Sequence, residues 1–488
     1  MVGELRPLTP LEIHRPGQFG LNKQAGDGVL PSGWSTVADN LVYNSEGSLA
    51  SRKGTKDLTD TDFSGAITTG GEYIDASATQ TRVFVDDTAF YKQNGTTMTD
   101  ITGSATAHPY KFVNFNGAFV GHHADYAPVS LATAGGTFAA ASGTQYNGKD
   151  VLSAWGRLWI LVGNTLRYSD LLINDFASGS AGSFDLASYW PRGMDESTGL
   201  AAWNDFLIVF GKESILIYEN PDDPTTSMAL ADIIEGTGCI ARDSIQTIGK
   251  DLLFLSASGV ETLGRVIQEK SMPLNEISKN VRDDIRGLAT STETIKSLYS
   301  ERERFYLLSF KDAGKVYCFD MSLRLEDGSY RATQWDMTIT DMFVCVLCGT
   351  VILITSDGTN SQAVTYTGYA DNVVYDGSGG ETYNIDWEGV WNDFGQELSQ
   401  RDKILKNCTV LMGGVDGDTS TVKWAVDYVD TFDSATITFP TINKAAAGIR
   451  VPMTKSGEVV KIGIESTIYG TEKALKRINI MAKIGRYV

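Results

Sequence analysis

Few residues in this chain have the types and spacing that catalysis or metal binding requires. The four histidines of the sequence are His14, His108, His122 and His123. None stands at helical spacing from another with a glutamate between them, which is the arrangement of helical zinc sites. His122 and His123 are adjacent, so on a strand their side chains point to opposite faces. We therefore predict no metal ligand among the histidines.

The cysteines include one close pair, Cys345 and Cys348, in a C-x-x-C arrangement. A zinc site needs about four ligands, and no second pair follows. Residues three apart on an extended strand also face opposite ways. Five cysteines in so long a chain are too few for a disulfide scaffold, so we interpret all of them as reduced and these two as buried thiols.

The glycine-rich and acidic motifs also do not predict a cofactor site or a catalytic site. The segment from Gly236 to Ala241 matches the dinucleotide fingerprint loosely, but no long helix follows that could hold a pyrophosphate, so it predicts a structural turn. Glycosidases use two carboxylates about 5 to 10 Å apart, and sequence alone cannot show that separation. The adjacent acids are Asp86-Asp87, Asp222-Asp223, Asp283-Asp284, Asp416 with Asp418, and Asp386-Trp387-Glu388. We interpret most as solvated turns and predict no catalytic residue, no cofactor site and no enzyme.

Composition narrows the class of protein. The 488 residues carry 60 acidic and 41 basic side chains, a net charge of −19. Tight nucleic-acid binding needs clustered Lys and Arg, so this chain is suited to surround DNA without gripping it. The first residues lack a basic stretch followed by an apolar one, and the longest apolar run, from Met342 to Thr355, is too short to span a bilayer. We expect a soluble protein made in a cytosol, without a membrane segment.

A repeated pattern organises most of the chain. A turn leads into an apolar strand, a second turn, and a second strand that often ends in an aromatic residue. The clearest copies are Trp155–Asp170, Trp203–Tyr218 and Ile248–Leu263. Continuous apolar runs of this length are typical of strands buried on both faces, and aromatic hairpins at this period indicate propeller blades. We predict an all-β propeller of six or seven blades over residues 63–380; consecutive β-sandwiches are the alternative.

Two regions fall outside the repeat, and one helix interrupts it. Residues 1–62 are rich in Gly, Pro and polar side chains and are expected to form an extended docking segment. Apolar residues at helical spacing predict a short helix over residues 275–287. Residues 381–488 are predicted to form a β-sandwich-like domain. Its final strands carry basic residues in an otherwise acidic chain: Lys473, Lys476, Arg477, Lys483 and Arg486.

Several short motifs resemble one known family. They are Gly20-Leu21-Asn22, Leu30-Pro31, Ala38–Val42, Gly47–Gly54, Arg157–Trp159 with Tyr168–Asp170, Phe210–Ile215, and Gly236–Cys239 with Asp243–Ile245 and Phe254–Gly259. Together they resemble the tail hub or nozzle proteins of short-tailed bacteriophages, also called tail tubular protein B or packaged-DNA stabilisation proteins. The likeness covers most of residues 17–320 and is patchy beyond them.

The resemblance implies a structural, non-enzymatic protein of the phage tail. Members of this family form a homohexameric ring below the portal and adaptor, through which double-stranded DNA is retained and then ejected, with fibres, spikes or a plug attached. The protein would then be made in the host cytoplasm and reside in the virion. Two rivals stay open: a glycan-binding or glycan-degrading tail protein, suggested by acids beside aromatics, and a monomeric cellular propeller that serves as an interaction platform.

Overall fold

The computed structural model describes residues 7–60, 63, 65–249, 251–264, 276–356, 360–395, 397–415, 418–438 and 447–487. The chain folds into two compact units, which we call the propeller unit (Asp57–Gly314 and Met337–Thr365) and the sheet unit (Met1–Lys56, Lys315–Asp336 and Tyr366–Val488). No helix among the described residues is both long and apolar enough to cross a membrane.

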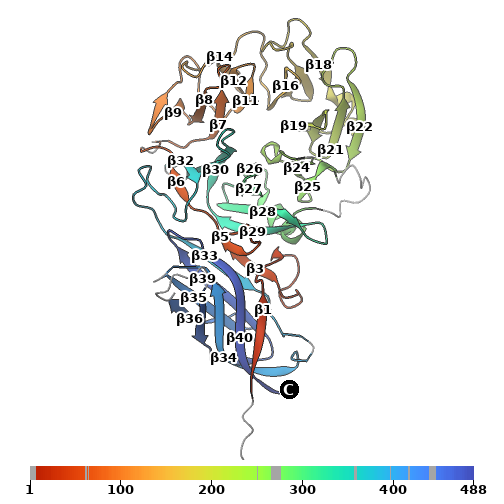
Figure 1. The fold of residues 1–488 in the computed structure, drawn as a ribbon. Coiled ribbons are helices and arrows are strands. Elements are labelled where there is room, and N and C mark those ends of the chain that lie inside the picture. The colour runs from red at the N-terminus through yellow and green to blue at the C-terminus, as the bar shows by residue number, and fades with distance from the viewer. Residues whose placement is uncertain are drawn as a thin grey trace, which may run out of the picture. The chain divides into compact units, whose positions relative to one another are not determined.

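The propeller unit confirms the predicted all-β propeller. Its inner strands follow one another around an axis (Figure 1), each beginning a small antiparallel sheet. The sheets are β7 (Thr69–Ile74), β8 (Gln80–Val85), β9 (Phe90–Asn94), β10 (Thr97–Asp100); β11 (Lys111–Phe115), β12 (Ala118–His122), β13 (Val129–Leu131), β14 (Ala139–Ala140); β15 (Asp150–Ala154), β16 (Arg157–Val162), β17 (Thr165–Tyr168), β18 (Gly182–Asp185); β19 (Ser197–Trp203), β20 (Phe206–Gly211), β21 (Ser214–Glu219), β22 (Ala229–Glu235); β23 (Gln246–Ile248), β24 (Asp251–Leu255), β25 (Val260–Thr262); and β30 (Ile339–Val344), β31 (Val351–Ser356), β32 (Ser361–Tyr366).

A further hairpin, β26 (Ile295–Ser300) with β27 (Phe305–Phe310), lies between the sheets that begin with β23 and β30. In the part of the chain that the structure describes, the propeller unit thus has six sheets and this hairpin, which agrees with six or seven blades. The ring is closed by chain that follows β6 (Thr55–Asp57), where Leu58 N–H donates to the carbonyl of Ala363 at 3.0 Å.

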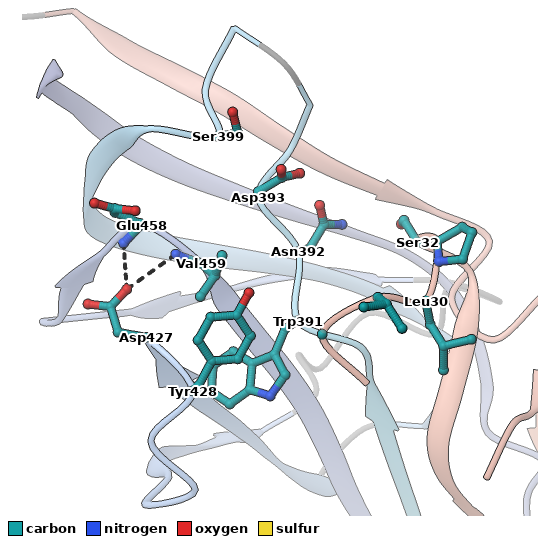
Figure 2. Close-up of a pocket in the computed structure, with 13 residues that line it drawn as sticks. Leu30, Ser32, Trp391, Asn392, Asp393, Ser399, Asp427, Tyr428, Glu458 and Val459 are labelled. Carbon is teal, nitrogen blue, oxygen red and sulfur yellow. Dashed lines mark hydrogen bonds between the residues drawn. The ribbon is translucent and has the colours of Figure 1, made fainter. Parts of the chain in front are cut away.

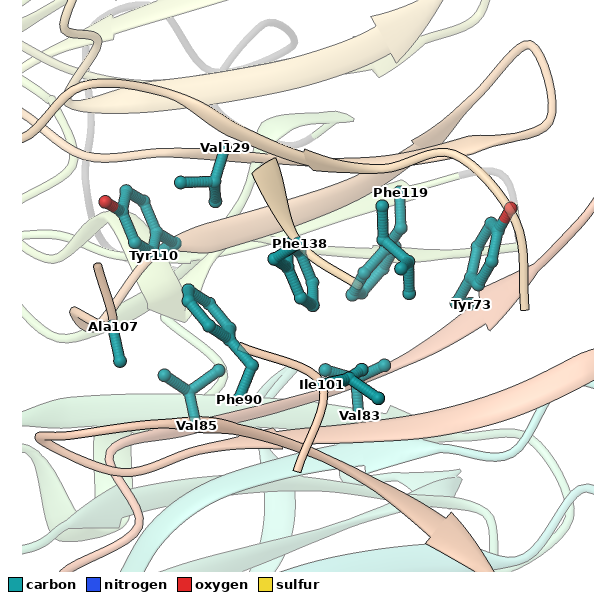
Figure 3. Close-up of a cluster of buried hydrophobic side chains, with 11 residues drawn as sticks. Tyr73, Val83, Val85, Phe90, Ile101, Ala107, Tyr110, Phe119, Val129 and Phe138 are labelled. Carbon is teal, nitrogen blue, oxygen red and sulfur yellow. The ribbon is translucent and has the colours of Figure 1, made fainter. Parts of the chain in front are cut away.

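The apolar runs in the sequence explain why the sheets stack. Leu158, Trp159, Ile160 and Leu161 of β16 are all fully buried, because a neighbouring sheet covers each face. Figure 3 shows one such interface, a buried cluster that includes Val83 and Val85 of β8 and Phe119 of β12. The rings of Phe90 and Phe138 stack there at 4.2 Å between centroids. Each sheet therefore buries apolar area only when its neighbours are present.

The predicted helix is shorter than expected. Residue 275 lies outside the described residues, and the α-helix α2 covers Arg282–Leu288 after a 3₁₀ turn at Lys279–Val281. Ile277, Val281 and Ile285 are buried, as the helical spacing predicted. Further 3₁₀ turns occur at Leu186–Ser188, Pro191–Gly193 and Arg242–Ser244.

The sheet unit contains two sheets. One has the order β37 (Ala447–Pro452), β34 (Arg401–Met412), β40 (Ala474–Tyr487), β5 (Leu49–Ser51), β4 (Leu41–Tyr43), with β1 (Leu8–His14) on β40 and β38 (Ser456–Gly457) on β34. In the other, the strands of this unit follow the order β28 (Lys315–Arg324), β29 (Tyr330–Asp336), β3 (Trp34–Asp39), β33 (Tyr383–Gly389), β39 (Val460–Ile468), β35 (Thr419–Val426), β36 (Asp433–Thr438), with β2 (Gly20–Leu21) on β3.

This organisation corrects the three predicted segments 1–62, 63–380 and 381–488. Residues 1–56 are not a separate extended segment, because β1 pairs along its whole length with β40, from Leu8 opposite Lys483 to His14 opposite Arg477. Residues 315–336 and 366–380 belong to the sheet unit and not to the propeller. Strand patterning shows which residues face a core, but it does not show which distant strand is the partner.

Candidate functional site

A pocket of about 670 Å³ opens in the sheet unit (Figure 2). Its volume falls within the range of small-molecule sites. One wall comes from the loop that precedes β3, and the others come from the segments after β33 and around the β35–β36 turn. The lining residues are Gly28, Val29, Leu30, Pro31, Ser32, Trp391, Asn392, Asp393, Ser399, Asp427, Tyr428, Glu458 and Val459.

Two aromatic rings form the apolar part of this pocket. The centroids of Trp391 and Tyr428 are 5.2 Å apart and the rings are tilted by 52°. Trp391 is buried against Ala425 and Val459, whereas Tyr428 is 59% exposed. Trp391 therefore packs against one side of the Tyr428 ring, and the rest of that ring is accessible to a ligand.

The backbone that carries Tyr428 is unusual. Asp427 and Tyr428 have φ values of 54° and 59°, which side-chain-bearing residues seldom adopt. The carboxylate of Asp427 holds this turn, since its Oδ1 accepts hydrogen bonds from Glu458 N at 2.6 Å and Val459 N at 3.3 Å. Such conformations cost about 1–3 kcal/mol each and are frequent at binding sites.

The polar groups of the pocket are acidic. Asp393, Asp427 and Glu458 line it, and no Lys or Arg is among the lining residues. The ammonium group of Lys461 lies over the Trp391 ring, but it is already paired with Asp27 at 3.2 Å and Glu388 at 3.3 Å. An aromatic face beside hydrogen-bond acceptors suits the apolar face and hydroxyl groups of a sugar, or a cation.

A second cavity, of about 330 Å³, lies at the axis of the propeller unit among its inner strands. Oppositely charged side chains meet there. Lys111 Nζ lies 2.5 Å from Asp150 Oδ1, and Asp243 is bound by both Arg242 (Nε to Oδ1, 2.7 Å) and Lys296 (Nζ to Oδ2, 2.9 Å). We call these five residues, with Asp341, the axial network.

Two aspartates of the axial network join neighbouring sheets. Asp150 Oδ2 accepts the backbone N–H of Leu200 on the next inner strand at 2.6 Å. Asp341 Oδ2 accepts that of Gly70 at 3.0 Å, which links the last sheet to the first. Burial alone would raise the pKa of Asp243, but the charges of Arg242 and Lys296 hold it well below its usual range. The network is therefore a structural tie around the ring, and the small axial cavity has no room for a duplex.

Two of the histidines, His108 and His123, lie against the same ring, that of Tyr126, at 3.3 and 4.7 Å between centroids. His122 is fully buried, and burial lowers its pKa to about 4, so it is neutral. His14 contacts Glu12 at 2.7 Å. The described residues contain no group of three or more His, Cys, Asp and Glu side chains placed to hold a metal ion.

The interpretation of Cys345 and Cys348 as buried thiols is wrong, because the two form a disulfide and Cys348 is exposed. The expectation failed because it placed both residues on a strand. They lie instead in the loop between β30 and β31, where a turn brings their Cα atoms to 5.5 Å. The other three cysteines, Cys239, Cys318 and Cys408, are free, as predicted, and they are buried.

Several acids of the predicted pairs have structural partners. Asp86 Oδ1 accepts from the N–H groups of Thr88 and Ala89, which makes a turn. Asp386 and Glu388 share one face of β33, where Lys423 binds both, at 2.9 and 2.8 Å. Trp387 points the other way and is buried. This triplet therefore belongs to an ion-paired strand, and Asp416 lies outside the described residues.

One further prediction has a clear outcome. The Gly236–Ala241 segment is a turn, as predicted: a side chain at Gly238 would meet the carbonyl of Gly211, and only a 3₁₀ turn follows. Of the C-terminal basic residues, Lys473 is buried and bonds to Ser466 Oγ at 2.9 Å. Sequence reasoning missed the pocket and the axial network, since both join residues far apart in the chain.

No protein-family model matches the sequence, and no characterised protein matches it in sequence. Solved structures of similar fold include BamB from Moraxella catarrhalis, at 11% identity over 67% of this chain and 95% of that chain, with a TM-score of 0.37. Another is the Pan2 WD40 domain of Neurospora crassa, at 9% identity over 64% and 96%, with a TM-score of 0.36. A third is an exo-β-1,3-galactanase from Phanerochaete chrysosporium, at 11% identity over 88% and 100%, with a TM-score of 0.28.

Proposed function

We propose that this protein is a structural component of a bacteriophage tail. Copies of the chain would form a hub or nozzle ring, a hexamer below the portal and adaptor, that retains the packaged DNA and conducts it during ejection. Fibres, spikes or a plug would attach to the ring. On this proposal the protein is made in the host cytoplasm, resides in the virion and performs no catalysis.

The observation that carries the proposal is the structural role of the residues that resemble the family. Arg52, in the Gly47–Gly54 motif, donates to Asn40 Oδ1 at 3.0 Å and to both carboxylate oxygens of Asp371, at 2.9 and 2.6 Å. Asn40, in the Ala38–Val42 motif, takes a φ of 56° and donates to the carbonyl of Asn384 at 2.8 Å. These motif residues thus connect distant segments of the sheet unit. Such a structural role supports a resemblance to a family of structural proteins.

The distribution of charge also supports a conduit. Counted along the sequence, the propeller unit holds 35 Asp and Glu against 19 Lys and Arg, whereas the sheet unit holds 25 against 22. An acidic wall repels phosphates, so DNA slides past without contacts that must break. We propose that acidic side chains of the propeller unit face the lumen and that the sheet unit is a sandwich-like docking module.

The first test is the mass of the purified protein in solution, followed by electron microscopy of any assembly. A sixfold ring with a central opening wide enough for a duplex is the expected result. A monomer at every concentration would contradict the proposal and favour the interaction-platform alternative. A ring whose opening is lined by basic side chains would contradict the electrostatic part alone.

A second candidate function is glycan binding, and the Trp391–Tyr428 pocket favours it. Exposed aromatic rings beside carboxylates can stack on a sugar and accept its hydroxyl hydrogens. Binding to host polysaccharide, measured by titration calorimetry, should weaken on Tyr428→Ala and persist on Tyr469→Ala, which removes an equally exposed ring elsewhere. Equal binding by the two variants would exclude this pocket.

A further inference from the structure

One face of the β1–β40–β34–β37 sheet is open and basic. Ile478, Ile480 and Ala482 of β40 are fully buried, so the alternate residues of that strand point away from the core. Four basic residues on strands of this sheet that are exposed or half-buried carry the argument: Lys406, Arg450, Arg477 and Lys483. We call these four the basic face.

Strand pairing brings the basic face together. Thr409 of β34 pairs with Arg450 on one side and with Asn479 of β40 on the other. Arg477 and Lys483 stand six residues apart on β40, which is about 20 Å along an antiparallel strand. Apolar side chains lie among them, including Leu8, which is 44% exposed opposite Lys483.

The cations of the basic face have no ion-pair partner among the described residues. By contrast, Lys476 of strand β40 is paired with Glu46 at 3.0 Å. The acid on β1, Glu12, is partly exposed and is in contact with His14 at 2.7 Å. Unpaired charges mixed with exposed apolar groups are typical of a protein-binding surface.

The propeller unit offers a matching acidic surface. It is the outer hairpin β21–β22, whose exposed acids are Glu213, Glu219, Asp222 and Glu235. Within the described part of the chain these four have no ion pair, and the neighbouring Lys212 is bound to Glu196 at 2.8 Å. Glu213, which directly precedes β21, and Glu219, the last residue of β21, are six residues apart in sequence, as are Arg477 and Lys483 on β40. We call these four acids the acidic hairpin.

We propose that the basic face of one copy binds the acidic hairpin of a second copy. The contact is heterologous, because the two surfaces differ, and heterologous contacts that close produce rings. The proposal therefore rests on the ring proposed above and deepens it by naming the interface between subunits. The apolar residues among the cations favour a protein partner over phosphate, which a purely polar basic surface would serve better.

Charge reversal on each surface, followed by their combination, tests this contact. Arg477→Glu with Lys483→Glu on the basic face should weaken assembly at least about tenfold in protein concentration, and Glu213→Lys with Glu219→Lys on the acidic hairpin should do the same. A mixture of the two double variants should recover hetero-assembly through their complementary surfaces. Arg286→Glu, a reversal at an exposed position on α2, is the control and should assemble like the parent. Mass photometry and sedimentation velocity in 0.15 M and 1 M salt would measure these effects.

The outcomes distinguish failure of the proposed contact from failure of the proposed tail function. If the parent forms a ring and both double variants form it equally well, the contact is wrong and the tail proposal stands. If the parent forms another assembly that the variants break and the mixture restores, the contact stands and the ring is wrong. Loss of binding to a 30-base-pair duplex by the basic-face variant, with assembly unchanged, would assign the surface to DNA and overturn the contact. Unfolding curves for each variant identify any loss that comes from misfolding.

Discussion

Cation–carboxylate pairs occur in both units of this protein, including Arg52 with Asp371 in the sheet unit, but one buried lysine of the sheet unit is stabilised differently. In the propeller unit, the axial network sets cations against carboxylates, as in the contacts of Asp243 with Arg242 and Lys296. In the sheet unit, Lys403 is fully buried and binds three backbone carbonyls instead: those of Leu398 at 2.7 Å, Arg401 at 3.1 Å and Glu458 at 2.5 Å.

The difference follows from what each unit must hold together. A ring of separate sheets needs ties between neighbouring inner strands, and an aspartate can bind a lysine and the next strand's N–H at once, as Asp150 does. Lys403 instead anchors loops of the sheet unit, because one ammonium group can donate to several backbone carbonyls at once. Burial consequently lowers the pKa of Lys403, whereas carboxylates keep the pKa of Lys296 raised despite its burial.

The largest effect is expected from removing a carboxylate of the axial network. Asp150→Ala leaves Lys111 without its partner and the N–H of Leu200 without an acceptor. We expect a loss of about 3–5 kcal/mol in the free energy of unfolding, measured by urea denaturation. Asp87→Ala, at an exposed turn, is the control and should change little. Equal losses in the two variants would mean that the axial network does not hold the ring.

The propeller unit also contains a carboxyl group without such compensation. Burial, aided by the nearby Glu261, raises the pKa of Glu276 to about 7, although Arg282 opposes this. Between pH 4.5, the ordinary value, and about 7 the folded protein binds more protons than the unfolded chain, so stability falls as pH rises through this window. We expect a difference of up to about 3 kcal/mol between pH 4.5 and 7.5, measured by denaturation at both pH values. Glu276→Gln should flatten this difference, and an unchanged profile would place the titration elsewhere.

A smaller loss is expected in the sheet unit. Lys403→Met leaves carbonyl groups unsatisfied but creates no orphaned charge, so the expected cost is about 1–3 kcal/mol. Lys406→Met, at the exposed neighbouring position, is the matched control. A loss as large as that of Asp150→Ala, in parallel urea titrations, would remove the distinction between the two units.

The smallest effect should come from the disulfide. Cys345 and Cys348 close a loop of only four residues, so their bond restricts the unfolded chain little. Cys345→Ser with Cys348→Ser should lower the free energy of unfolding by about 2 kcal/mol or less, and reducing agent should then have no further effect. A larger loss would show that the loop positions its contact with Glu72, whose Oε2 accepts Val346 N at 2.5 Å.

Local patterns predicted local structure well. The runs at Trp155–Val162 and Trp203–Phe210 became the buried strands β16 and β20 with the turns that precede them. The β-structure predicted within residues 381–488 is present, and its longest strands are β34, β35, β39 and β40. The failures concern geometry beyond the strand: the Cys345–Cys348 loop was taken as extended, and Asp386-Trp387-Glu388 was considered for a site without knowledge of Lys423.

The sequence by itself determined that this chain is a series of hairpins that must stack, because four-residue apolar runs bounded by turns bury area only against neighbours. Only the tertiary structure decided that β1 pairs with β40 and that Arg52 meets Asp371. It also decided that Trp391 and Tyr428 share a pocket. Apolar residues at every second position show which face of a strand is buried. Backbone hydrogen bonds are the same for every partner strand, so the pairing of distant strands depends on the packing of the whole unit.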